Sequence, residues 1–154
     1  MSILDMISGE PKMSNKFLVE FPKEFNIQCW SIQKTNLPKF INGEWGYIKI
    51  EFFDVFTPST SNGLFKIVNF VKTKKDETDE LFNIKIKLLD SIGVEVEEWV
   101  ISVKKVLIVN FGELDYNKSD EILSPYLIVK PEKCVLNTIN FSETDLKKDT
   151  QIKV

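Results

Sequence analysis

Residues 82–103, FNIKIKLLDSIGVEVEEWVISV, decide the fold class of this chain. Apolar and polar residues alternate from 82 to 89, which is the two-residue period of a strand with one buried face. A turn signal, DSIG, follows at 90–93, and the chain then returns with the same alternation. The alternation slips at Glu97-Glu98, which predicts a β-bulge. The stretch therefore predicts a β-hairpin with one solvated face and one packed face.

Further strands are predicted outside this hairpin, because other stretches either alternate or form short apolar runs bounded by turn residues. These stretches are FLVEF (17–21), NIQCWSIQ (26–33), GYIKIEFF (46–53), VLIVNF (106–111) and SPYLIVK (124–130). The segment NGEWG at 42–46 reads as a turn.

One helix is predicted over 62–74, where four apolar residues recur at i, i+3, i+4 and i+7. They are Leu64, Ile67, Val68 and Val71. A polar run from Ser59 to Asn62 precedes them and supplies an N-cap. Short strands with a single helix predict a mainly β fold, a small β-sandwich or barrel with one packed α-helix and extended terminal arms.

The expected organisation is a single domain, which suits a chain of 154 residues. Residues 1–16 form an N-terminal arm that Gly9 and Pro11 interrupt. The β domain follows, and the last residues carry many charges but few large apolar groups, as a tail does. The predicted boundaries are 1–16 for the arm, 17–137 for the single β domain and 138–154 for the C-terminal tail.

The composition argues against several kinds of site. The chain contains no His, and the printed sequence also holds no Arg and no Ala. The usual general base and zinc ligand are therefore missing, as are the bidentate forks that grip phosphate. A net charge of −3 and a pI of about 5.2 argue against a protein that binds duplex nucleic acid. We expect no catalytic residue, no metal and no cofactor.

The carboxylates offer only weak alternatives to this expectation. Glu97 and Glu98 are adjacent in a strand, so they point to opposite faces and cannot share a substrate unless the bulge turns them. A second acidic group follows the helix but lacks the glycine-centred spacing of a calcium loop, and we interpret it as a solvated linker. That group is Asp76, Glu77, Asp79 and Glu80.

The cysteines and the hydropathy indicate an ordinary cytosolic chain. Cys29 and Cys134 belong to no CxxC pair, and without a His partner each is expected to be a reduced, packed thiol. No apolar run is long enough to span a membrane, and the N-terminus does not resemble a secretory signal.

The remaining signal is assembly, because the strands carry more apolar surface than a domain of this size covers alone. Aromatic residues cluster around 40–56, and the arms have no core of their own, as in proteins whose strand edges and arms join neighbours. The candidate contact residues are Ile3, Leu4, Met6, Ile7, Phe40, Trp45 and Phe53. A monomer with a few exposed aromatic residues remains the alternative.

The order of these pieces resembles the tail tube proteins of contractile-tailed, T4-like bacteriophages, over about residues 15–137. FLVEF (17–21), CWSIQKTNLPKF (29–40) and the helix resemble successive parts of that family's fold. The closing block 99–136 is the most specific part. Within it the resemblance rests on Trp99, Gly112, Glu113, Leu114, Asp115 and Tyr116.

The resemblance implies a structural virion protein and no enzyme. Such proteins form hexameric rings that stack into a tail tube, the conduit for genome delivery, around a tape-measure protein and inside a contractile sheath. The implied partners are further copies of the chain, the tail sheath protein, the tape-measure protein, baseplate and tail-terminator proteins, and DNA in non-specific passage. The implied location is the virion tail, assembled in the host cytoplasm.

Within such a tube, the polar face of the 82–103 hairpin is expected to line the lumen. The candidate lumen residues are Asn83, Lys85, Lys87, Glu95 and Glu97. The outer wall under the sheath is the other position open to this face.

Several other functions stay open at this point. The resemblance to tail tube proteins is also compatible with a baseplate–tube junction protein or with the inner tube of a bacterial contractile injection system. A monomeric β-sandwich binding module would need an aromatic patch, for which Trp30, Trp45 and Tyr47 are the candidates. An enzyme using carboxylate–lysine chemistry would need paired acids in a pocket.

Overall fold

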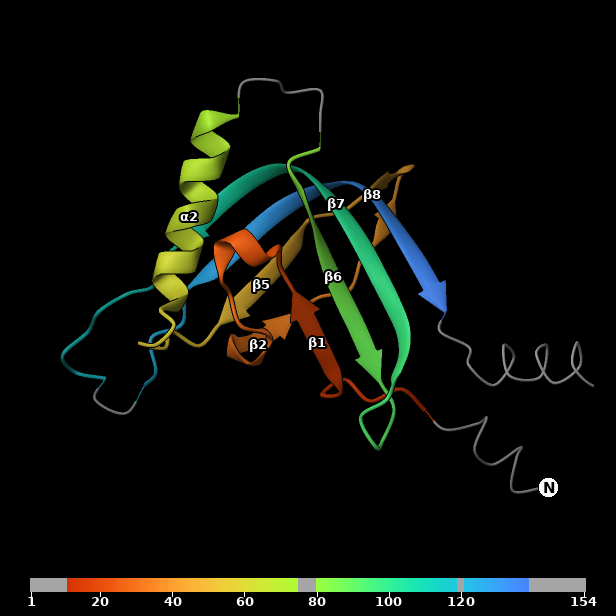
Figure 1. Cartoon of the computed structure of the whole chain (residues 1–154), viewed down its shortest axis with the longest axis horizontal. Helices are drawn as coiled ribbons and strands as arrows, with labels where there is room; N and C mark the ends of the chain where they lie inside the picture. The colour runs from red at the N-terminus through yellow and green to blue at the C-terminus, as the bar shows by residue number, and fades with distance from the viewer. Residues whose placement is uncertain (1–10, 75–79, 119–120, 139–154) are drawn as a thin grey trace, which may run out of the picture.

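The structure is a computed structural model that describes residues 11–74, 80–118 and 121–138. It confirms the mainly β fold with one helix: a six-stranded antiparallel sheet curls into a nearly closed barrel, with the strand order β1-β6-β7-β8-β5-β2 (Figure 1). Its strands are β1 (Phe17–Glu20), β2 (Ile32–Thr35), β5 (Ile48–Phe52), β6 (Phe82–Leu89), β7 (Glu95–Asn110) and β8 (Tyr126–Thr138).

The other elements sit around this sheet. Strands β3 (Phe40–Ile41) and β4 (Glu44–Trp45) form a separate small hairpin, and α2 (Thr60–Thr73) stands beside one end of the barrel (Figure 1). Two 3-10 turns, η1 (Lys23–Phe25) and η2 (Cys29–Ser31), connect β1 to β2.

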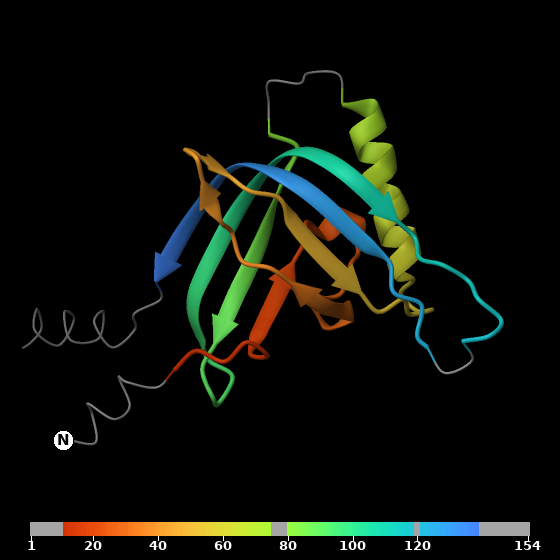
Figure 2. The ribbon, with the colours of Figure 1, turned by 180° about the vertical axis from the view of Figure 1, so that it is seen from behind.

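The long pair β7–β8 forms the middle of the sheet and bends along its length. Its register shifts at three places, which leave Lys104 and Leu107 as extra residues in β7 and Glu132 as the extra residue in β8. Bulges of this kind increase the local twist of a strand pair. The first half of β7 therefore pairs with β6 on one wall of the barrel. The first half of β8 pairs with β5 on the other wall (Figure 2).

The inner face of the barrel forms one core. Alternate residues of each strand are completely buried there, as the period of two requires. The predicted alternation of β6 is confirmed, because Phe82, Ile84 and Ile86 are buried while Asn83 and Lys85 are exposed. Residues of five other strands complete the core: Val19, Ile32, Ile48, Ile50, Phe52, Ile101, Val103, Leu127 and Val129.

Helix α2 closes one end of this core. The predicted cap is confirmed: the Ser59 side chain accepts a hydrogen bond of 3.1 Å from the backbone N–H of Asn62. Leu64 and Ile67 are completely buried. The helix approaches η1 so closely that a Cβ atom on Gly63 would lie 2.8 Å from the carbonyl oxygen of Phe25. A glycine is therefore required by packing rather than by backbone conformation.

The segment 26–33 does not form the predicted continuous strand. The backbone N–H of Ser31 donates to the Gln28 carbonyl at 3.0 Å and the Ser31 hydroxyl donates to the same oxygen at 2.7 Å. This local turn competes with strand pairing, so η2 forms and β2 begins only at Ile32. Cys29 consequently lies in a turn and not in an alternating strand.

The strands predicted after residue 94 are also longer than expected. The stretches 94–103 and 106–111 belong to one strand, β7, and the stretch 124–130 continues as β8 to Thr138. Pro131 lies inside β8 next to the extra residue Glu132. A proline, which cannot donate to the ladder, is tolerated at such a bulge.

Substitution of Gly63 by Ala tests the close approach of α2 to η1. Helix propensity alone would stabilise the variant by about 1 kcal/mol. We expect the clash with Phe25 to outweigh this gain, so that the free energy of unfolding falls by about 1–3 kcal/mol in urea titrations. Asn69→Ala, on the exposed side of the same helix, is the matched control and should be neutral or slightly stabilising. A stabilised Gly63→Ala variant would contradict the packing described here.

Candidate assembly interface

The outer face of β1, β6, β7 and β8 carries a group of charged residues, and it is called here the charged face. Cross-strand partners share a face of a sheet, and the register sets Glu20 opposite Lys85, Lys87 opposite Glu98, and Ser102 opposite both Asn83 and Lys133. Its polar and charged residues are Glu20, Asn83, Lys85, Lys87, Glu95, Glu98 and Lys133, and the register places Leu18, Val100 and Val135 among them. Its three lysines and three glutamates carry equal and opposite formal charge.

Lys87 is the centre of the ion pairs on the charged face. Its Nζ atom lies 3.0 Å from Glu20 Oε2 and 3.2 Å from Glu95 Oε1, which joins three strands through one ammonium group. The hydrogen bond to Glu20 is the main cause that raises the pKa of Lys87 above its usual value of 10.5, and Glu95 adds to it. Partial burial opposes this shift but does not cancel it.

The structure brings together four of the five predicted lumen residues, namely Asn83, Lys85, Lys87 and Glu95. Glu97 lies on the opposite face, because it pairs with Leu88, and its carboxylate contacts Lys12 Nζ at 2.7 Å. The register shifts between Leu88 and Leu89 and leaves Val96 as the extra residue, so the bulge lies one residue before its predicted position. Glu98 takes the place on the charged face that the sequence pattern gave to Glu97.

The β3–β4 hairpin carries two of the predicted contact residues. Asn42 and Gly43, with φ of 53° and 83°, form its two-residue turn, as the Asn-Gly pair favours. The Phe40 and Trp45 rings pack at a centroid distance of 5.1 Å, and Trp45 in turn contacts Trp99 of β7 at 6.3 Å. Phe40 itself is 63% exposed, so this hairpin presents an aromatic surface to a neighbour.

Phe53 is placed less favourably for a contact than the hairpin residues. Phe53 is half-buried, and its backbone N–H donates to the Ser31 carbonyl at 2.7 Å. The four apolar residues of the arm, Ile3, Leu4, Met6 and Ile7, lie outside the described residues.

A groove of about 590 Å³ separates the β3–β4 hairpin from the outer face of β5 and β8, and it is called here the hairpin groove. Lys130 Nζ lies 3.5 Å from Glu44 Oε1 and 5.2 Å from the centre of the Tyr47 ring. Three lysines against one glutamate leave the groove net positive. Its charged and apolar lining is Lys39, Ile41, Glu44, Trp45, Tyr47, Lys49, Ile128 and Lys130.

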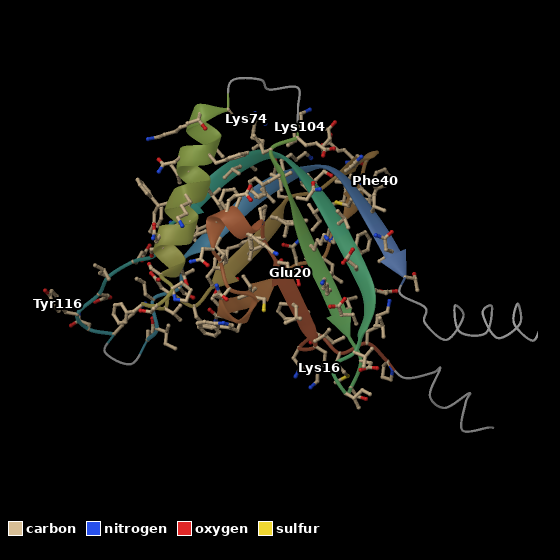
Figure 3. The ribbon with its side chains drawn as sticks, in the orientation of Figure 1. Lys16, Glu20, Phe40, Lys74, Lys104 and Tyr116 are labelled. Atoms are coloured by element: carbon tan, nitrogen blue, oxygen red, sulfur yellow. The ribbon has the colours of Figure 1, made fainter. Side chains whose placement is uncertain are left out.

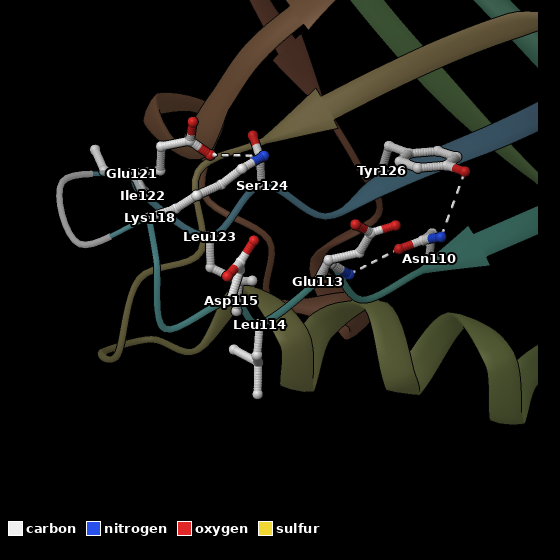
Figure 4. A pocket seen from close by; sticks show the side chains of 11 residues that line it. Asn110, Glu113, Leu114, Asp115, Lys118, Glu121, Ile122, Leu123, Ser124 and Tyr126 are labelled. Carbon is white, nitrogen blue, oxygen red and sulfur yellow. Dashed lines mark hydrogen bonds and ion pairs between the residues drawn. The ribbon is translucent and has the colours of Figure 1, made fainter.

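The connection from β7 to β8 forms a second distinctive surface, called here the acidic loop and described at 111–118 and 121–125 (Figure 4). At its base the backbone N–H of Gly112 donates to Asn110 Oδ1 at 2.8 Å, and the φ of Gly112 is 103°. Further along, Leu114 is 90% exposed and Tyr116 is fully exposed. Exposed apolar side chains on an acidic loop indicate a contact surface.

The sequence singled out Gly112–Tyr116 of this loop as part of the family resemblance and not as a contact surface, and it did not predict the hairpin groove. The signal in the sequence that points to a contact surface is the segment GELDY, in which a Leu and a Tyr stand next to two acidic residues. The groove had no such signal, since its residues come from two stretches, 36–49 and 128–130, that lie far apart in the sequence.

The described residues offer little for catalysis. Burial raises the pKa of the Cys134 thiol to about 11, which keeps it protonated and unreactive. No three metal-binding side chains gather within the described ranges. Of the three candidates for the aromatic patch of a binding module, Trp45 and Tyr47 line the hairpin groove, and Trp30 is not part of that lining. None of the described helices is long and apolar enough to cross a bilayer.

Comparison by sequence finds no relative: no protein-family model matches the chain, and no curated protein matches it. Comparison by structure finds similar folds. A chain from the extended sheath–tube complex of the extracellular contractile injection system PVC is 12% identical, with a TM-score of 0.61 over 90% of this chain and 99% of the other.

Two further solved chains are similar to a comparable degree. One comes from the tube-terminating cap of the anti-feeding prophage, with 14% identity and a TM-score of 0.60 over 83% of this chain and 91% of the other. The second comes from the baseplate of the anti-feeding prophage, with 17% identity and a TM-score of 0.55 over 86% of this chain and 99% of the other. This chain therefore shares the fold of components of contractile injection systems.

Substitution of Lys87 by Met tests the ion pairs of the charged face. We expect the variant to lose about 0.5–1 kcal/mol of unfolding free energy near neutral pH, because two carboxylates lose their partner. A raised lysine pKa stabilises the folded state below the unfolded pKa, and this contribution disappears as pH rises through the folded pKa. The difference between wild type and variant should therefore shrink in urea titrations as the pH rises past 10.5 and Lys87 loses its proton in the folded state.

The matched control for this prediction is Lys85→Met. Lys85 lies on the same face of the same strand but is exposed and forms no ion pair with any described residue. Its substitution should leave the unfolding free energy nearly unchanged at every pH. Equal losses in the two variants would argue against a special role of Lys87.

Proposed function

We propose that this chain is a structural subunit of a contractile tail or injection device and forms hexameric rings that stack into its tube. The observation that carries the proposal is the likeness to a chain of the PVC sheath–tube complex, which extends over 99% of that chain. The two candidate contact surfaces support it, because an isolated subunit has no need for exposed aromatic and apolar residues at both of its ends. A T4-like phage tail is the specific setting that the sequence pattern favours.

The function proposed is mechanical and not enzymatic. A rigid tube needs no catalyst, and the protected Cys134 thiol and dispersed acids suit a passive wall. Its partners in the proposal are other copies of the chain, a sheath, a tape-measure protein, and the baseplate and terminator proteins at the two ends of the tube. The proposed location is the virion tail.

The charged face is the best candidate for the wall of the lumen. DNA carries a dense negative charge and binds surfaces that offer unpaired cations. On the charged face Lys87 is held by Glu20 and Glu95, and the face as a whole carries as many glutamates as lysines. Such a surface is hydrated and lets a polyanion slide without holding it.

A cap, terminator or baseplate junction is the second candidate, because solved chains of those assemblies share the fold as well. The two candidates differ in one property. A tube subunit stacks ring upon ring, whereas a terminator or junction forms one ring and then binds a different protein.

Electron microscopy of the purified protein tests the proposed function. We expect six-fold rings at moderate concentration and open tubes at high concentration, since identical subunits with head-to-tail contacts close into rings. Sedimentation velocity on the same samples measures the mass. Single rings that never stack would favour the terminator or junction, and a monomer at every concentration would refute both candidates.

Size-selective labelling tests the position of the charged face. In Lys85→Cys tubes, we expect a small maleimide to react and a maleimide on a large polyethylene glycol to be excluded, because the lumen is narrow. Unassembled Lys85→Cys subunits, in which the same side chain is exposed, should react with both reagents, and wild-type tubes measure the background from Cys29 and Cys134. Equal reaction of assembled tubes with both reagents would place this face on the outside.

A further inference from the structure

The acidic loop and the hairpin groove are complementary in charge and in polarity. The segment Glu113–Tyr116 offers two carboxylates, no base, and two apolar side chains that contact almost nothing in their own subunit. The hairpin groove offers a net positive lining with apolar walls. Oppositely charged surfaces with matching apolar groups are the arrangement found across specific interfaces.

These two surfaces lie at opposite ends of the same molecule. Figure 3 shows Tyr116 at one end of the long axis and Phe40 of the β3–β4 hairpin toward the other, and in Figure 2 the connection from β7 to β8 and the β3–β4 hairpin are also apart when seen from behind. The loop of one copy therefore cannot fill its own groove. Another copy can fill it, and each copy then keeps one free loop and one free groove.

We propose that the segment Glu113–Tyr116 of one copy occupies the hairpin groove of a second copy. Leu114 and Tyr116 lie against the apolar lining formed by Ile41, Tyr47 and Ile128, and the loop carboxylates face Lys39 and Lys49. Such a head-to-tail contact joins two different surfaces, so repetition closes a ring or extends a filament. The inference rests on the proposed function and names the contact through which the ring closes.

The groove has lysines available for this contact. Lys39 forms no ion pair with any described residue, and Lys49 lies over the Tyr126 ring at 4.5 Å without a carboxylate partner among the described residues. Lys130 already pairs with Glu44. A carboxylate that enters the groove can therefore pair with Lys39 and Lys49, which have no carboxylate partner among the described residues of their own subunit.

Charge exchange tests the contact. We expect Glu113→Lys and Lys39→Glu each to weaken self-association about tenfold in sedimentation velocity, and the double variant to recover most of it. Leu114→Ser should weaken association by a similar factor. Ile92→Ser, an equally exposed apolar residue in the β6–β7 turn, is the control and should associate like wild type. Circular dichroism checks that every variant is folded.

Cross-linking locates the contact directly. Differently tagged Leu114→Cys and Ile41→Cys chains are mixed, assembled and oxidised, and we expect a disulfide between the two tags. Either variant alone should give no more cross-link than wild type, which carries Cys29 and Cys134. The expected pattern is therefore a mixed dimer that forms only when both variants are present.

The outcomes separate this contact from the proposed function. Rings that assemble normally from the Glu113→Lys variant and give no mixed cross-link overturn the contact and leave the ring proposal standing. Variants that assemble normally but lose binding to a sheath or terminator protein overturn it as well, because the loop then serves another partner. A wild-type protein that stays monomeric overturns both.

Discussion

The fold depends on one constraint: a single buried face must be shared by both halves of the bent β7–β8 pair. Near the start of β7, Ile101 and Val103 enter the core between β6 and β8, whereas Leu127 and Val129 of β8 enter it beside β5. If β7 and β8 paired without bulges, either Ile101 and Val103 or Leu127 and Val129 would face away from the core. The bulges at Lys104, Leu107 and Glu132 supply the twist that keeps both inside.

Local patterns in the sequence were enough to predict the elements whose geometry is set by near neighbours. The alternation of β6, the turn after Asp90 and the cap at Ser59 follow from residues within a few positions of each other. The bulges of β7 and β8 depend on pairing between distant segments, and alternation within one strand does not reveal them. The same reason explains why Glu97 was placed on the wrong face and why the hairpin groove was missed.

Bending the sheet also produces two chemically different outer surfaces. The wall that contains β6 pairs lysines with glutamates across strands, and Lys87 joins three strands there. The wall that contains β5 instead presents Tyr47, Lys49 and Ile128 beside the β3–β4 hairpin. A balanced, hydrated surface resists adhesion, whereas a cationic surface with apolar groups favours it. The two walls therefore suit different neighbours within an assembly.

Folding and assembly draw on separate residues in this chain. The core side chains are buried without help from a partner, while Leu114, Tyr116 and Phe40 add little to the stability of the subunit because solvent surrounds them. Changes at such positions leave the fold intact. This independence gives a physical reason why chains of a sheath–tube complex, a tube-terminating cap and a baseplate keep a common fold with this chain at 12%, 14% and 17% identity.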